Sequence, residues 1–132
     1  MTQRSRLKPR CEGCGLKPES CMCATLPRIR LATPVIVVQH VREQPKPTST
    51  VRLLASMLDN LRVLPYGMRE PAFDPSPLEA HDVQWLLLSP RDDATELAAP
   101  EPGARPRGFV VLDGTWSQCS RMARRVPVVR EL

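Results

Sequence analysis

Residues Asp113-Gly114-Thr115-Trp116 place a carboxylate, a flexible glycine and a hydroxyl next to one another. They follow Phe109-Val110-Val111-Leu112, an apolar run typical of a buried strand, and they precede residues 117–125, whose pattern indicates a basic amphipathic helix. Ligands of open α/β sheets bind at the carboxyl ends of strands. We therefore predict a functional site here, with Asp113 as a general base that takes or orients a proton. The alternative for Asp113 is a helix N-cap.

A second polar segment, residues 39–50, directly follows an apolar strand expected at 34–38. Lys46 and the hydroxyls of residues 48–50 precede a helix N-terminus, where free backbone amides favour a carboxylate or phosphate. The alternative for Thr48 and Ser49 is simple helix capping. Arg52 is unfavourable at the positive end of the helix dipole, which favours a negative partner nearby. His40 is weaker, since a histidine at a strand end is more often structural.

Four cysteines lie within 13 residues in the pattern Cys11-x2-Cys14-x6-Cys21-x-Cys23. Four thiolates suit tetrahedral zinc, and a closed four-sulfur site has no open position for catalysis. We therefore predict a structural zinc knob at residues 11–27, which is also a possible RNA contact. A redox cluster is the alternative. Cys119 lies alone on the apolar face of the last expected helix and is expected in the core.

Length and composition set the broad class. The chain has 132 residues, 42% of them apolar, enough for one domain and a small appendage. No apolar run approaches the roughly 20 residues of a membrane helix, and the basic N-terminus lacks the hydrophobic segment of a secretory signal, so we expect a cytoplasmic protein. The net charge of +5 permits a polyanionic partner such as nucleic acid, although a solvated basic surface is the plainer interpretation.

The expected elements alternate between strands and helices. We expect strands at 34–38, 61–64, 84–88 and 109–112 and a helix after residue 50 that buries Val51, Leu54, Ala55 and Leu58. A helical turn near 78–81 and a short helix at 94–99 are also possible. This order predicts an α/β fold with a mostly parallel sheet flanked by helices. The expected division is a basic tail at 1–10, the knob at 11–27 and an α/β domain at 28–132.

Four segments in this order resemble the DTW-domain family, the tRNA-uridine aminocarboxypropyltransferases. They are the cysteine pattern; Gln39-His40-x2-Glu43-x2-Lys46-Pro47-x2-Thr50-x-Arg52-Leu53; Leu88-Ser89-Pro90; and Leu112-Asp113-Gly114-Thr115-Trp116 with Arg121-Met122. Each segment alone is weak, but four in one order are quite specific.

The resemblance implies that S-adenosylmethionine gives its 3-amino-3-carboxypropyl group to N3 of a tRNA uridine and leaves as methylthioadenosine. It also implies a SPOUT-like fold with a C-terminal knot. Residues expected at the donor are Lys46, Thr48, Ser49, Thr50, Leu88, Ser89, Leu112, Gly114 and Thr115. Residues expected at the RNA are His40, Glu43, Arg52, Trp116, Arg121, Arg124 and Arg125. For Trp116, helical spacing with Cys119 and Ala123 favours core packing at least as strongly as base stacking.

The chain departs from the family pattern in two ways. Ser49-Thr50-Val51 stands where members commonly have Asn-Thr-Gly, so a ligand contact is weakened. Members also continue beyond the DTW helix, so we expect the domain here to lack its knot region and to expose a sheet edge that invites a homodimer. The alternatives to the transferase are a non-catalytic zinc-containing RNA-binding module and an RNA methyltransferase of the same fold class.

Overall fold

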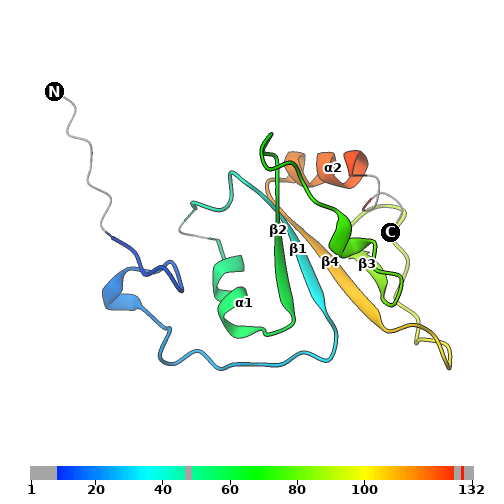
Figure 1. Ribbon diagram of the computed structural model, residues 1–132, viewed down its shortest axis with the longest axis horizontal. Helices are drawn as coiled ribbons and strands as arrows, with labels where there is room; N and C mark the ends of the chain where they lie inside the picture. Colours follow the sequence, from blue (N-terminus) through cyan, green and yellow to red (C-terminus); the bar gives the residue numbers. More distant parts are fainter. Residues whose placement is uncertain (1–8, 47–48, 127–128, 130–132) are drawn as a thin grey trace.

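The computed structural model describes residues 9–46, 49–126 and 129. Its elements are a 3-10 turn η1 (Pro18–Ser20), β1 (Val35–His40), α1 (Val51–Met57), β2 (Leu61–Tyr66), a second 3-10 turn η2 (Ser76–Leu78), β3 (Gln84–Leu88), β4 (Arg107–Asp113) and α2 (Trp116–Arg125). Figure 1 shows the strands side by side, with the cysteine-rich segment next to α1 and away from β3. Most of the predicted basic tail lies outside the described residues.

The four strands form one parallel sheet in the order β2-β1-β4-β3. The two central strands, β1 and β4, hold most of the buried strand residues, including Ile36, Val37, Val38 and Val110. Strands that are apolar on both faces need cover on both faces, which explains their central position. The predicted α/β class is therefore confirmed, whereas the SPOUT-like relationship and the expected lack of the knot region stay predictions.

The core lies mainly on the sheet face that α2 covers. Met122 is fully buried there, with Val38, Val110 and Trp85 among its neighbours in the apolar cluster. Leu78 of η2 joins the same cluster, because the long connection from β2 to β3 crosses this face. Side chains alternate between the faces of a strand, so Gln39 and Asp113 lie on the opposite face from Val38 and Leu112.

The predicted strands are present, but β2 runs further than expected. It continues through Pro65 to Tyr66, where the sequence predicted a stop. Within the described sheet β2 pairs only with β1, and proline is tolerated on such an edge strand because one side needs no ladder hydrogen bonds. The predicted pairing of an exposed edge with a second copy stays a prediction.

Two predictions about helices were wrong. The segment 94–99 contains no helix, and Leu97 within it is exposed. A six-residue helix that buries no apolar face does not offset the free-energy cost of helix nucleation. The predicted buried face of α1 is largely open as well. Val51 is buried, but Leu54 is 39% exposed and Ala55 is exposed, because α1 is short and packs beside the edge strand β2. The predicted turn at 78–81 begins earlier, at Ser76.

No helix in the described part of the chain is long and apolar enough to cross a bilayer.

Candidate functional site

The three segments expected to contribute site residues, 39–50, 88–90 and 112–116, meet at the carboxyl edge of the sheet. β1 ends at His40, β4 ends at Asp113 and β3 ends at Leu88, and all three strands run in the same direction. Gln39 and Asp113 are register partners on neighbouring strands. The parallel order thus brings residues that are more than 70 positions apart to one edge, where open α/β sheets bind ligands.

Asp113 is held by a buried glutamine. The Gln39 Nε2 donates a hydrogen bond of 2.9 Å to Asp113 Oδ2 and a weaker one of 3.4 Å to Ser49 Oγ. The N-cap alternative for Asp113 is wrong, because Thr115 occupies that position in α2. Thr115 Oγ1 accepts from the Gln118 amide, and Gln118 Oε1 accepts from the Thr115 amide, which completes a capping box.

The predicted capping of α1 by Ser49 is also wrong. The N-cap residue is Thr50, and its side chain makes no capping hydrogen bond. The hydroxyl of Ser49 instead faces Gln39. Thr48, the other predicted cap and donor contact, lies outside the described residues.

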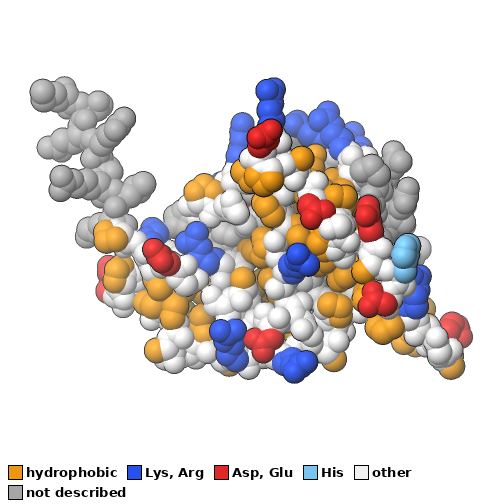
Figure 2. All heavy atoms as spheres, in the orientation of Figure 1, with side chains coloured by type: hydrophobic (Ala, Val, Ile, Leu, Met, Phe, Trp, Pro, Cys, Tyr) orange, Lys and Arg blue, Asp and Glu red, His pale blue; other side chains and the backbone are white. Residues whose placement is uncertain are grey.

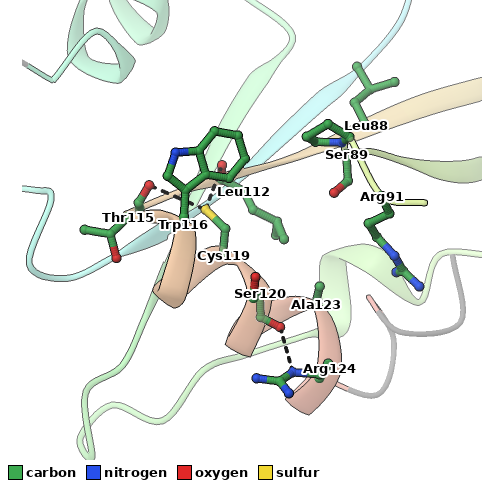
Figure 3. Close-up of a pocket in the computed structure, with 12 residues that line it drawn as sticks. Leu88, Ser89, Arg91, Leu112, Thr115, Trp116, Cys119, Ser120, Ala123 and Arg124 are labelled. Atoms are coloured by element: carbon green, nitrogen blue, oxygen red, sulfur yellow. Dashed lines mark hydrogen bonds between the residues drawn. The ribbon is translucent and has the colours of Figure 1, made fainter. Parts of the chain in front are cut away.

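A cleft of about 1110 Å³ lies beside this edge, on the face of the sheet that α2 covers. Five of the residues predicted to bind the donor line it: Leu88, Ser89, Leu112, Gly114 and Thr115. Figure 3 shows Ser89 and Arg91 on one side of the cleft and Cys119, Ser120 and Ala123 of α2 on the other. Its volume is slightly above the usual range of about 300–1,000 Å³ for small-molecule pockets. Asp113 does not line the cleft, but its neighbours on both sides do.

The floor of the cleft contains the thiol of Cys119. Its Sγ lies 3.5 Å from the carbonyl oxygens of Leu112 and Gly114. Burial, followed by the negative charges of Asp113 and Glu43, raises the pKa of Cys119 above its ordinary value. The predicted core position is thus only partly confirmed, since Cys119 packs against the core and also faces the cleft.

Trp116 lies at the mouth of the cleft and is 81% exposed. The core-packing alternative for Trp116 is therefore wrong: the first turn of α2 points its indole outward (Figure 3). Arg121, Arg124 and Arg125 are exposed on the same helix. In Figure 2, Lys and Arg side chains gather along the upper edge, where Figure 1 places α2.

The segment between β1 and α1 holds its charged residues close to one another. Lys46 Nζ lies 2.5 Å from Glu43 Oε1, and the Glu43 side chain is only 13% exposed. The backbone amide of Arg42 donates to His40 Nδ1, so this ring has a local structural contact. Arg52 Nη2 donates to the Gln44 carbonyl at 3.3 Å. This carbonyl is neutral, so the negatively charged partner expected for Arg52 stays a prediction.

The four cysteines of the N-terminal segment form a compact ligand set. Their sulfur atoms all lie within 4.8 Å of one another, and three of the separations are 3.5, 3.5 and 3.8 Å. Tetrahedral zinc with Zn–S bonds of about 2.3 Å separates its sulfurs by about 3.8 Å, so the set fits that ion. Gly13 permits this approach, because a Cβ there would lie 2.9 Å from the Cys23 sulfur.

The thiols of this cluster share their protons unequally. Hydrogen bonds from the backbone of Cys14 and Gly13 lower the pKa of Cys11 to about 6, whereas hydrogen bonding with Cys11 raises the pKa of Cys23 to about 12. Backbone hydrogen bonds from Met22 and Leu16 also lower the pKa of Cys14, so Cys11 and Cys14 ionise more readily than Cys23. A bound cation would supply the positive charge that four thiolates require.

Comparison with known proteins decides the family. The profile of the DTW domain matches residues 8–132, which is nearly the whole chain. The chain belongs to the DTW domain family. It is 28% identical over 123 residues to tRNA-uridine aminocarboxypropyltransferase 2 of Mus musculus, covering 88% of this chain and 41% of the mouse protein. The protein of the same name from Drosophila melanogaster is 27% identical over 129 residues, covering 93% of this chain and 51% of the fly protein.

This DTW chain thus spans about half the length of the curated relatives it matches, or less. No solved structure matches it closely enough to report.

Several residues of this DTW site were not predicted individually. Gln39 was part of the quoted motif, and its position as a polar side chain at the end of a buried apolar strand was the available signal. Arg91, Ser120 and Ala123 line the cleft without any sequence signal, because only the packing of α2 against β4, the neighbour of β3, brings them together. Lys46, Thr50 and Arg52 belong to the predicted site but do not line the cleft.

Proposed function

We propose that this DTW domain transfers the 3-amino-3-carboxypropyl group of S-adenosylmethionine to N3 of a uridine in tRNA. The observation that carries the proposal is that two family motif segments, 88–90 and 112–116, line one cleft at the carboxyl edge of the sheet. The third segment, 39–53, begins at the same edge, where Gln39 contacts Asp113. Relatives named tRNA-uridine aminocarboxypropyltransferase 2 support the same reaction.

The cleft is the proposed donor site. Leu88 and Leu112 offer apolar contact, while Ser89 and Thr115 offer hydroxyls and Gly114 allows close approach to the backbone. Lys46, Ser49 and Thr50 belong to the same site in the proposal, from the neighbouring loop. Lys46 forms an ion pair with Glu43. To contact the donor carboxylate, the Lys46 ammonium must therefore leave the Glu43 carboxylate.

The donor supplies an electrophilic carbon attached to a sulfonium. Uridine N3 is a poor nucleophile while it keeps its proton, so Asp113 accepts that proton as general base. The bond between N3 and the aminocarboxypropyl carbon forms as the carbon–sulfur bond breaks, and the electron pair leaves with methylthioadenosine. Asp113 is suited to this role because Gln39 holds one carboxylate oxygen, and no hydrogen bond to its other oxygen, Oδ1, occurs among the described residues.

The tRNA is proposed to approach along α2. Arg121, Arg124 and Arg125 are exposed and match the phosphate backbone in charge, so affinity falls as the salt concentration rises. Trp116 is exposed at the mouth of the cleft, where its ring can stack on a base. His40, Glu43 and Arg52 complete the proposed RNA-facing set. The four cysteines bind structural zinc in this proposal.

The first test is calorimetry with S-adenosylmethionine on folded protein. Saturable binding supports the donor site, and the absence of binding would leave a zinc-containing RNA-binding module as the better account. The second test identifies the nucleoside product after incubation with tRNA. Methylthioadenosine supports the proposed transfer, whereas S-adenosylhomocysteine identifies a methyltransferase.

Asp113→Asn tests the proposed base directly. We expect a loss of turnover of about 10²–10⁴-fold with donor binding retained, since general-base catalysis contributes on this scale. Asp59→Asn is the matched control, because Asp59 is a surface carboxylate that pairs with Arg28 and lies just before the start of β2, away from the carboxyl ends of the strands. Full activity of Asp113→Asn contradicts the assignment of the base.

A further inference from the structure

The buried amide of Gln39 is unusual among its neighbours. Gln39 is 5% exposed and is the only polar residue among the buried residues of the described chain. Burying an amide costs about 1–3 kcal/mol unless its hydrogen bonds are made. An apolar residue would fill the same position at the end of an apolar strand without that cost. Packing alone therefore does not explain a glutamine here.

Both known contacts of the Gln39 amide are donated by Nε2. One goes to Asp113 Oδ2 at 2.9 Å, and the other goes to Ser49 Oγ at 3.4 Å. An ionised carboxylate can only accept, so the nitrogen of the amide must face Asp113 for the bond to form. The second contact reaches the residue before the N-cap of α1. Gln39 thereby connects the ends of β1 and β4 with the start of α1.

The register of the sheet fixes this contact. Gln39 and Asp113 are partners on adjacent central strands, and they share the face opposite to Val38 and Leu112. Asp113 is only half-buried, and its other neighbour along the chain, Gly114, already belongs to the turn. Without a partner on β1, the carboxylate at the strand end is free to rotate about its side-chain torsions.

We propose that Gln39 is a positioning residue that orients the Asp113 carboxylate toward the reacting uridine. This inference rests on the proposed function, because it assigns a purpose to the orientation of Asp113. Gln39 holds Oδ2 and leaves Oδ1 for the proton of N3. It does not line the donor cleft, and its bond to Ser49 of the proposed donor site is the weaker of its two, so it acts on turnover more than on donor binding.

Gln39→Leu removes the donor while keeping an apolar side chain of similar size. We expect kcat to fall about 10–100-fold, by analogy with the loss of hydrogen-bond partners that orient metal-binding side chains. The dissociation constant for S-adenosylmethionine and the KM for tRNA should stay within about threefold of wild type. Gln84→Leu is the matched control, because Gln84 begins β3 at the opposite end of the sheet.

Gln39→Glu separates positioning from a packing role. Its shape is nearly that of glutamine, but an ionised carboxylate repels Asp113, while a protonated one donates a hydrogen bond to it. We expect its activity relative to wild type to rise as the pH is lowered. A uniform loss at every pH, with unchanged thermal stability, would contradict positioning.

Two further results distinguish this inference from the proposed function. If Asp113→Asn is inactive and Gln39→Leu is fully active, the inference fails while the function stands. If the wild-type chain has no transferase activity, NMR of the Gln39 side-chain amide tests the contact alone. Downfield amide protons that shift in Asp113→Ala support the hydrogen bond, and unchanged resonances overturn the inference.

Discussion

Arg52 of α1 lies directly over Gly15 of the cysteine-rich segment. A Cβ at Gly15 would come within 2.9 Å of Arg52 Nη1 and 3.1 Å of its Cδ. Arg52 also donates to the Gln44 carbonyl, and Ser56 Oγ donates to the Gly13 carbonyl at 3.2 Å. The cysteine-rich segment is thus attached to α1 and, through Arg52, to the loop that carries Glu43 and Lys46.

Gly15→Ala should loosen this attachment. Gly15 has φ +74°, which costs a residue with a Cβ about 1–2 kcal/mol, and the added carbon also displaces the Arg52 side chain. Gly103→Ala is the matched control, since Gly103 has φ +78° with nothing within 4 Å. We expect denaturant unfolding to show a larger loss of stability for Gly15→Ala. Equal losses for the two variants would mean that the contact with Arg52 has no energetic role.

Removing the metal should affect the same attachment. We expect purified protein to contain about one equivalent of zinc, as four thiolates at these separations favour. Chelation should then increase hydrogen exchange in residues 11–27 and in α1 while leaving β1 and β4 protected. Cys23→Ser should lose the zinc, and Cys119→Ser should keep it because Cys119 lies outside the cluster. Folded, zinc-free wild-type protein would contradict the metal site.

Thr115→Ala should destabilise α2. The substitution removes one half of the capping box with Gln118, which costs about 1 kcal/mol. Thr115→Ser keeps the accepting hydroxyl and should be close to wild type. Ser117→Ala, two residues further on and exposed, provides the control for a hydroxyl lost without a cap. The midpoint of denaturant unfolding measures all three, and an unchanged midpoint for Thr115→Ala would disprove the role of the cap.

Cys119 should react slowly with alkylating reagents at mildly alkaline pH. The thiolate is the reactive form, and burial together with the charges of Asp113 and Glu43 raises the pKa of this thiol. Its reaction rate should therefore keep rising with pH beyond the range in which an ordinary thiol is already ionised. Asp113→Asn removes one of the two charges and should accelerate the reaction, whereas Asp59→Asn should not. Peptide mass spectrometry separates Cys119 from the other cysteines.

The parts of the fold that the sequence predicted are those encoded locally. The strands at 84–88 and 109–112 are visible as apolar runs, and the order of strands and helices predicts the parallel sheet. The positions of Trp116 and Leu54 were not predictable in this way. Helical spacing suggests a buried face for both, but burial depends on whether a partner surface lies opposite. α1 packs at a sheet edge, and the first turn of α2 projects beyond the strands.

The same distinction between local sequence and long-range pairing applies to the residues of the candidate site. Asp113 and the hydroxyl of Thr115 could be found from their place after a buried strand. The contact between Gln39 and Asp113 could not, because it depends on β1 and β4 being neighbours in register. Likewise, the sequence predicted that Ser49 could cap α1, whereas its hydroxyl accepts a hydrogen bond from the buried amide of Gln39. Long-range pairing therefore decides which polar groups meet.

Trp116→Ala tests the proposed role of this exposed ring in tRNA binding. Trp116 is 81% exposed, so its removal should change stability by no more than about 0.5 kcal/mol. Stacking of a base on an aromatic ring contributes about 1–3 kcal/mol, which corresponds to a loss of about 5–150-fold in affinity. Trp116→Phe should retain most of the binding because it keeps an aromatic face. Fluorescence polarisation with labelled tRNA at one fixed salt concentration measures the three proteins, and equal affinity of Trp116→Ala and wild type would exclude stacking at this position.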